Sequence, residues 1–442
     1  MLRSHLGFGL FLLLLLVAPK LPVALSGGAA RSAVSLGFVG FIGWYLLCPE
    51  RLFRYPVITV RHAFFWVLAF ALYAVIISLL STKTVSIAYS IQFLFYSVCG
   101  IALMGCRALR PAPLDSNRSR WILFAVGVTY CLGVLVSVYV GPIYGHQTLA
   151  TRRHWGGFII PQGIGFAESQ NIAGAVIIVF LMASIYLYRG RLWKKWFLLS
   201  LFLSALLATL SRSAITSFLI ALFSVWVIAG IEPLARRASV RISVLTTMGF
   251  TILTFCVLVF GIIGVIALVN RSLVPTLFHG FGLGGNVSLI ADDAGSRLDL
   301  WIWGVRRWWA GSTLEVLFGG GFRSSMVVMP HGAWKTAHNM YITVLSDFGV
   351  VGVILFLAIP LSAIGHYTSL FLLGKAGQAE SFSLATVIAL SLHSTTGPYL
   401  YSPICLSLLL LALAQNPCHS GSAGPSWLPG KSRSCKLASS TL

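Results

Sequence analysis

The sequence is short of charged residues. Asp, Glu, Lys and Arg make up 9% of its 442 residues, whereas a soluble domain contains about 25%. Hydrophobic residues make up 57%, and the mean hydropathy is +0.90. A soluble globular protein is therefore excluded, and the long apolar runs are predicted to cross a lipid bilayer.

Acidic residues and cysteines, two kinds of metal ligand, are few in this sequence. The chain has ten Asp and Glu against 31 Lys and Arg, and Mg²⁺ or Mn²⁺ sites use Asp or Glu carboxylates. Asp292 and Asp293 could bind a cation, but other acids on the same side are few. The eight cysteines show no zinc spacing, and none lies in the long loops considered below. The sequence predicts no metal, no cofactor and no disulfide framework.

Apolar runs of membrane-spanning length recur along the chain. About twelve are present, at 6–24, 33–49, 62–80, 86–105, 121–140, 171–188, 196–211, 213–230, 243–269, 346–366, 382–396 and 400–415. The first resembles a signal peptide, but no small-residue cleavage site follows promptly, so we expect it to remain as a helix. The predicted class is an all-α integral membrane protein.

The basic residues predict an orientation. With the N-terminus inside, the short cytoplasmic loops are rich in Arg and Lys, as the positive-inside rule requires. The formal charge of +21 is then mostly a consequence of topology. Nucleic acid is not an expected partner, because the basic residues are dispersed over separate loops beside apolar runs.

Two long loops on the predicted outer side carry cations that topology does not require. They are 141–170 and 271–343, and their candidate substrate-binding cations are Arg152, Arg153, Arg297 and Arg323. Loops of this length without a disordered composition are usually functional. We therefore expect a folded, cationic, aromatic-lined cavity on the outer face.

Segment 295–309, GSRLDLWIWGVRRWW, has the period of an amphipathic helix lying in the membrane interface. Its predicted apolar face contains Leu298, Trp301, Ile302, Val305, Trp308 and Trp309. Arg297 lies in the first turn, where a guanidinium beside free helix N–H groups can hold an anion. Arg306 and Arg307 are explained more simply as solvating the polar side and touching lipid phosphates.

Arg212 stands alone in the tight outer hairpin TLSRSAITS between two apolar runs. It could extend to lipid headgroups, or it could point into the same cavity as Arg297 so that two guanidinium groups hold a phosphate. The stretch GFAESQNIAGA, 165–175, begins another apolar run from the same side. Its Glu168 and Asn171 are possible substrate contacts.

The stretch KTAHNMYITVLSDFGVVG, 335–352, places His338 and Asn339 at the mouth of an apolar run. Histidine exchanges a proton near neutral pH, and ionisable groups at membrane depth suggest a functional site. His338 is thus the candidate catalytic residue, with a structural histidine as the alternative. Asn339 could hold a sugar hydroxyl or orient the imidazole, while Tyr341 and Asp347 could be simple helix-face contacts.

Four segments together resemble the O-antigen ligase and O-antigen polymerase superfamily. They are SRSA at 211–214, GSRLDLW at 295–301, GGGF at 319–322 and HNMYITVLSDFGVVG at 338–352. The match covers residues 165–355 approximately, and its last segment is the most specific part. The resemblance implies that His338 is the essential histidine and that Arg212 and Arg297 correspond to the family's conserved arginines. Arg152 and Arg153 match no family motif.

Members of this superfamily transfer glycans from undecaprenyl diphosphate at the periplasmic side of the bacterial inner membrane. The resemblance therefore implies a GT-C-like fold of about twelve transmembrane helices with a large helical periplasmic loop. Expected partners are the undecaprenyl-diphosphate-linked glycan, lipid A–core or another glycan acceptor, and membrane lipids. The implied parts are N-terminal helices (1–160), central helices (161–270), the periplasmic loop domain (271–343), C-terminal helices (344–415) and a cytoplasmic tail (416–442).

The residue types agree with this chemistry. Negative charge builds on the diphosphate as it leaves the sugar, and fixed arginines can stabilise it. His338 would accept the proton of the acceptor hydroxyl or hold that hydroxyl for in-line attack. The expected enzyme is a metal-independent glycosyltransferase that inverts the anomeric centre in a single displacement.

Other functions stay open. An O-antigen or exopolysaccharide polymerase and a protein O-oligosaccharyltransferase would share this core. A transporter of lipid-linked glycans would also need cationic cavity residues, but transporters usually place polar groups near the bilayer midplane on broken helices. Here the polar groups lie at the outer ends of the predicted helices and no internal repeat is evident, which favours an enzyme.

Overall fold

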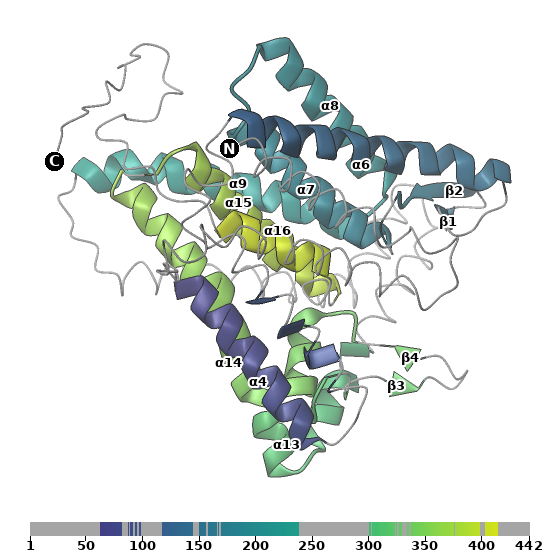
Figure 1. Cartoon of the computed structure of the whole chain (residues 1–442), viewed down its shortest axis with the longest axis vertical. Helices are drawn as coiled ribbons and strands as arrows, with labels where there is room; N and C mark the ends of the chain where they lie inside the picture. The colour runs from purple at the N-terminus through teal and green to yellow at the C-terminus, as the bar shows by residue number, and fades with distance from the viewer. Residues whose placement is uncertain are drawn as a thin grey trace, which may run out of the picture.

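The computed structural model describes residues 62–81, 117–144, 150–237, 300–374, 376–397, 403–413 and parts of 87–98, with gaps at 156–157, 166, 168, 302, 323, 325–326, 329–333 and 336. Helices account for 85% of these residues. The protein is therefore mostly helical, as its apolar runs predict. Figure 1 shows α4 lying along α14, with α15 and α16 between this pair and the helices α6 and α7.

Each long helix in the described part of the chain covers one predicted apolar run. These helices are α4 (His62–Leu80), α6 (Asn117–Tyr144), α7 (Gln170–Tyr186), α8 (Leu192–Ala208), α9 (Arg212–Arg237), α14 (Met340–Leu372), α15 (Gln378–His393) and α16 (Pro403–Leu413). The shorter elements are α13 (Thr313–Phe318), η4 (Ser394–Thr396), β1 (Ala150–Trp155), β2 (Phe158–Gly163), β3 (Val327–Val328) and β4 (Trp334–Lys335).

Four of the described helices are long and apolar enough to cross a membrane. Their spans are Ala63–Leu80 in α4, Arg120–Tyr139 in α6, Arg212–Gly230 in α9 and Met340–Leu372 in α14. The predicted runs 6–24, 33–49 and 243–269 lie outside the described residues. A total of about twelve spans and a GT-C-like architecture stay predictions.

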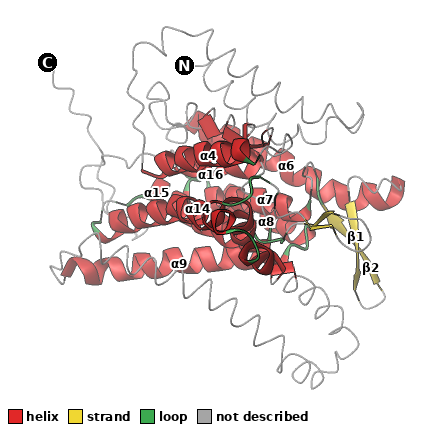
Figure 2. Cartoon of the chain, turned by 90° about the horizontal axis from the view of Figure 1, so that it is seen from below, coloured by secondary structure: helices red, strands yellow, loops and turns green. Residues whose placement is uncertain are grey.

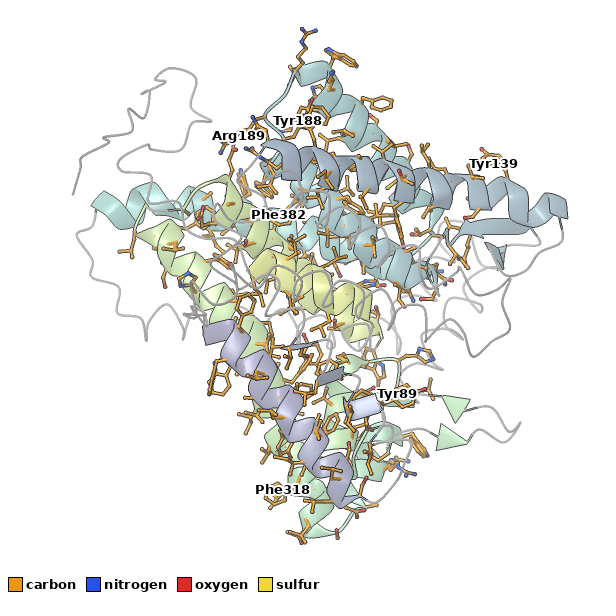
Figure 3. All side chains as sticks on the ribbon, in the orientation of Figure 1. Tyr89, Tyr139, Tyr188, Arg189, Phe318 and Phe382 are labelled. Atoms are coloured by element: carbon orange, nitrogen blue, oxygen red, sulfur yellow. The ribbon has the colours of Figure 1, made fainter. Side chains whose placement is uncertain are left out.

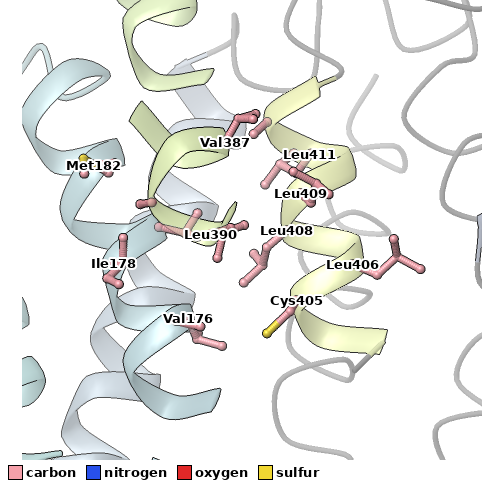
Figure 4. Packing of buried hydrophobic residues seen from close by; sticks show 14 of the residues in the cluster. Val176, Ile178, Met182, Val387, Leu390, Cys405, Leu406, Leu408, Leu409 and Leu411 are labelled. Carbon is pink, nitrogen blue, oxygen red and sulfur yellow. The ribbon is translucent and has the colours of Figure 1, made fainter. Parts of the chain in front are cut away.

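Helix α7 is buried on every side. All residues from Ile172 to Ser184 are buried, as expected for a helix that is apolar all round. Figure 4 shows side chains of α7, α15 and α16 packed between these helices. Because α7 is enclosed, the neighbouring helices pack around it on all sides.

Both predicted outer loops contain β-structure, so the expectation of a purely helical loop region is incomplete. Strands β1 and β2 pair antiparallel, with Arg153 opposite Ile160, and β3 pairs with β4. Figure 2 shows the β1–β2 hairpin at one end of the bundle, beside α6 and α7. The sequence signal is the Gly156–Gly157 pair between two segments rich in Thr, Ile and aromatic residues, which is typical of a hairpin.

A buried arginine joins the start of α6 to the end of α7. Arg120 donates from Nη1 to the carbonyl of Leu187 at 3.2 Å and from Nη2 to Oδ1 of Asn117 at 3.0 Å. Leu187 caps the C-terminus of α7, where a cation also interacts favourably with the helix dipole.

We expect Arg120→Met to lower the free energy of unfolding by about 1–3 kcal/mol, because the substitution leaves a buried carbonyl without its donor. Thermal unfolding of the purified protein in detergent measures the effect. Val136→Ala, at an exposed position of the same helix, is the control. Equal unfolding midpoints for the two variants would contradict a capping role for Arg120.

Candidate functional site

Arg212 is the first residue of α9, and its side chain is exposed. The turn before it has three residues, Thr209 to Ser211, because α8 ends at Ala208. Thr209 holds this turn by donating to the carbonyl of Leu206 at 2.6 Å and accepting from the N–H of Ser211 at 3.2 Å. A cation at the start of a helix opposes the helix dipole. Helix stability therefore does not explain an arginine at this position.

His338 lies immediately before α14 and is exposed. Its φ is 47°, a backbone conformation that non-glycine residues adopt uncommonly and that often occurs at functional sites. Among the described residues, Leu210 is the other non-glycine residue with positive φ, at 51°. One unusual conformation is thus at the candidate residue His338 itself, just before α14. The other is at Leu210, two residues before Arg212 and the start of α9.

Asn339 fixes the start of α14. Its Oδ1 accepts from the N–H groups of Tyr341 at 2.9 Å and Ile342 at 3.2 Å, which makes it the N-cap of the helix. The residue is buried. Its carbonyl oxygen is therefore engaged in capping, and its observed role is to define where the chain presents His338.

The last turn of α15 holds the starts of three other helices together. Nε2 of His393 donates to the carbonyl of Asn171, at the start of α7, at 2.9 Å, and the ring lies near the backbone of Ser213 in α9. The hydroxyl of Tyr341, in the first turn of α14, donates to the carbonyl of Ser391 at 2.9 Å. We call the end of the bundle where α7, α9 and α14 begin and α15 ends the site end.

These contacts place the start of α9, which carries Arg212, and the start of α14, which follows His338, at the same end of the bundle. Arg212 is adjacent to Ser213, and His338 is three residues before Tyr341.

A further polar contact joins α7 to the turn before α9. The hydroxyl of Ser211 donates to Oδ1 of Asn171 at 2.7 Å. The two helices approach closely here, because a Cβ on Gly174 would lie 2.6 Å from the Cβ of Ala214. Asn171, predicted as a substrate contact, therefore also supports the backbone that carries Arg212.

Sequence reasoning missed His393, which is completely buried. A signal was present, because an ionisable residue near the end of a predicted membrane run often has a defined partner. That partner, Asn171, is 222 residues away in the sequence. No local pattern indicates such a pairing.

The remaining predicted site residues are only partly located. Arg152 and Arg153 lie on β1, opposite Pro161 and Ile160. This hairpin is attached to α6, since Oγ of Ser137 accepts from the N–H groups that follow β2, at 3.1 and 3.0 Å. Glu168, Arg297, Arg323 and the pair Asp292–Asp293 lie outside the described residues.

The helical segment 303–309 packs against the start of α14 through a glycine. A Cβ on Gly304 would lie 2.8 Å from Cγ2 of Ile342, and the hydroxyl of Ser346 donates to the carbonyl of Gly304 at 3.1 Å. The face predicted to be apolar includes Val305, which is exposed. This exposure is compatible with the predicted place of the apolar face in the membrane interface. The contact at Gly304 was not predicted, because a glycine carries no hydrophobic signal.

Two segments of the family resemblance meet at a glycine junction formed by Gly319, Gly321, Asp347 and Gly349. The N–H of Gly321 donates to the carbonyl of Asp347 at 2.9 Å. A Cβ on Gly319 would overlap the Asp347 carbonyl, and a Cβ on Gly349 would overlap the carbonyl of Leu317. Gly349 has φ 64° and ψ −167° and interrupts α14 with a kink. The GGGF and DFG sequences are thus explained by backbone packing.

Helix α4 completes the glycine junction. The hydroxyl of Tyr73 donates to the carbonyls of Phe318 at 2.9 Å and Phe348 at 3.0 Å. The N–H of Phe322 donates to Oγ of Ser78 at 3.2 Å. The segment after His338 is therefore anchored to a membrane helix from another part of the chain.

Within the part of the chain that the structure describes, no group of three or more His, Cys, Asp or Glu residues could hold a metal ion. Asp347 is buried and accepts from the hydroxyl of Ser324 at 3.3 Å. Glu315 belongs to the capping box at the start of α13. Of the predicted site residues, Arg212, His338, Asn339 and Asn171 are the ones that the structure describes at the site end.

Comparison with known proteins adds no relative. A scan of protein-family models finds no matching family, and a search of the curated proteins finds no match. The resemblance to the O-antigen ligase and polymerase superfamily thus depends on the motif residues themselves.

Proposed function

We propose that the protein is an O-antigen ligase-like glycosyltransferase. It would move a glycan from undecaprenyl diphosphate to lipid A–core at the periplasmic face of a bacterial inner membrane. The observation that carries this proposal is that the start of α9, at Arg212, and the start of α14, after His338, lie at the same end of the bundle, near the last turn of α15. This arrangement supports a site that combines a permanent cation with a proton acceptor.

In the proposed reaction, the acceptor hydroxyl attacks the anomeric carbon of the sugar while the bond to the diphosphate oxygen breaks. Arg212 meets the negative charge that develops on the leaving diphosphate, and the motif match assigns Arg297 the same role. His338 receives the hydroxyl proton or positions the hydroxyl. A single displacement inverts the anomeric centre.

The proposal includes no metal. A diphosphate can be neutralised by guanidinium groups as well as by Mg²⁺, and the sequence has only ten acidic residues with which to hold an ion. Undiminished transfer in the presence of EDTA is the expected result. Loss of transfer on chelation and recovery with Mg²⁺ would replace this part of the proposal by a metal-assisted reaction.

Two related enzymes are the principal alternatives. An O-antigen or exopolysaccharide polymerase and a protein O-oligosaccharyltransferase use the same kind of donor and differ in the acceptor. A transporter of lipid-linked glycans is less well supported, because Arg212 and His338 lie at helix starts, whereas transporters usually bind at the midplane.

The deciding experiment is transfer by the purified full-length protein. Undecaprenyl-diphosphate-linked glycan is supplied with lipid A–core, with a second glycan chain or with a pilin-like peptide, and the products are separated by mass. Product with lipid A–core supports the ligase, and product with another acceptor supports the corresponding alternative. Donor that crosses vesicle membranes without forming any product would support a transporter and contradict the enzyme.

We expect Arg212→Gln to lower kcat for transfer by about 10²–10³-fold, the effect of removing one charge-stabilising donor. Arg212→Lys should retain part of the activity, because it keeps the charge but loses the bidentate geometry. Arg307→Gln, at an exposed arginine that stacks on Trp303 at 5.6 Å, is the matched control. Equal activity of Arg212→Gln and the control would exclude Arg212 from diphosphate binding.

A further inference from the structure

The end of the bundle opposite the site end carries a surface formed by Trp121 of α6 and Arg191, Trp193 and Lys194 at the start of α8. We call it the Trp–Lys surface. Figure 3 shows Tyr188 and Arg189 near one end of α6 and Tyr139 near its other end. The charge pattern of the sequence predicts that this end faces the cytoplasm.

Lys194 is held between two indole rings from different helices. Its Nζ lies 5.8 Å from the ring centroid of Trp121 and 5.4 Å from that of Trp193. Both distances are within the range of cation–π attraction. The two tryptophans are 52% and 62% exposed, so the rings position the ammonium group without enclosing it.

The neighbouring groups that the structure describes offer little negative charge to the cations of this surface. Arg189 donates from Nε to Oε1 of Gln378 at 2.9 Å, which is a neutral partner. The nearby acid, Glu380, is buried and caps the start of α15 by accepting from Gly377 at 2.7 Å. Residues 187–197 contain four cations and no acid.

Two further polar groups, Lys195 and the Tyr188 hydroxyl, lie beside the Trp–Lys surface in the sequence. Lys195 donates to the carbonyl of Ile185 at 2.9 Å, and burial lowers its pKa, so it has a structural role. The hydroxyl of Tyr188 is buried against Gly190 and has no hydrogen-bond partner among the described residues.

We propose that the Trp–Lys surface binds the headgroup of an anionic phospholipid. The exposed indoles of α6 and α8 contact the acyl region near the headgroups, as aromatic residues do at membrane interfaces. Lys194 and Arg191 pair with the lipid phosphate. A zwitterionic lipid would bind less well, because its own cation competes with these groups. The site is separate from the proposed catalytic function.

The test is thermal unfolding of the purified full-length protein in detergent with added phosphatidylglycerol or with phosphatidylcholine of the same acyl chains. Phosphatidylglycerol should raise the Tm of the native protein by about 2–5 °C, through binding to the folded state. Phosphatidylcholine and inorganic phosphate at the same concentrations should raise it much less. Equal shifts with both lipids, or with phosphate alone, would overturn the proposal.

Variants locate the site. Lys194→Gln should need at least about five times more phosphatidylglycerol for half of its Tm shift, since a bound charge pair contributes roughly 1 kcal/mol near a membrane surface, whereas Lys194→Arg should respond nearly like the native protein. Val136→Ala, at an exposed position 15 residues after Trp121 in α6, should respond fully. A full response by Lys194→Gln, or a loss equal to it in Val136→Ala, would show that the lipid does not bind here.

Discussion

Replacing His338 with asparagine is expected to reduce glycan transfer by about 10²–10⁴-fold, the usual contribution of a positioned general base. Asparagine tolerates the positive φ of this position better than other residues do, so the backbone should keep its conformation. The side chain is exposed, and its replacement leaves no cavity. Transfer of glycan from undecaprenyl diphosphate to the acceptor is the measurement, with the unfolding midpoint recorded for each variant.

A comparison of two substitutions distinguishes the effect of the imidazole from the effect of the backbone conformation at position 338. His338→Ala removes the imidazole and also places alanine at φ 47°, which adds strain. If His338→Asn is fully active while His338→Ala is inactive, the conformation matters and the imidazole has no part in the reaction. Loss of activity in both variants, with unchanged unfolding midpoints, is the result that the proposed mechanism requires.

The helices could be predicted because hydrophobic length is a local property of the sequence. The run 62–80 corresponds to α4, and the hairpin containing Arg212 is the short turn between α8 and α9. The start of α14 could also be predicted, since Asn339 is a favourable N-cap residue before an apolar run. These features depend on neighbouring residues, which single-sequence reasoning uses well.

The contacts that organise the site end could not be predicted, because they join distant segments. His393 binds Asn171 across 222 residues, and Tyr341 binds Ser391 across 50. Hydropathy also gives no signal for close helix–helix packing at a glycine. Gly304 packs closely against Ile342 of α14, and nothing in its neighbouring residues predicts this contact.

The structure also separates two roles within the segment most specific to the family resemblance. His338 is exposed at its beginning, whereas Asp347 is buried at the glycine junction. A match to this segment therefore combines residues that can act on a substrate with residues that hold α13, α14 and α4 together. Substitutions at the two ends should fail for different reasons, one in chemistry and the other in folding.

Gly349→Ala is expected to prevent stable folding, although it adds a single methyl group. The φ of 64° with ψ −167° belongs to a region that essentially only glycine occupies, and the new Cβ would overlap the Leu317 carbonyl. Backbone atoms cannot move aside as a flexible side chain can, so the glycine junction must open. The expected loss exceeds about 3 kcal/mol in the free energy of unfolding. Size-exclusion chromatography and thermal unfolding in detergent measure the outcome.

Gly230→Ala is the matched control, since a Cβ there would meet nothing within 4 Å. It lies inside α9, and alanine at an interior helix position should stabilise the protein by up to about 1 kcal/mol. Gly319→Ala should resemble Gly349→Ala, because φ is 84° and the new Cβ would overlap the Asp347 carbonyl from the other side of the junction. If Gly349→Ala unfolds at the same temperature as Gly230→Ala, then α14 is not kinked at Gly349, and the packing of α13 against it is different from that described above.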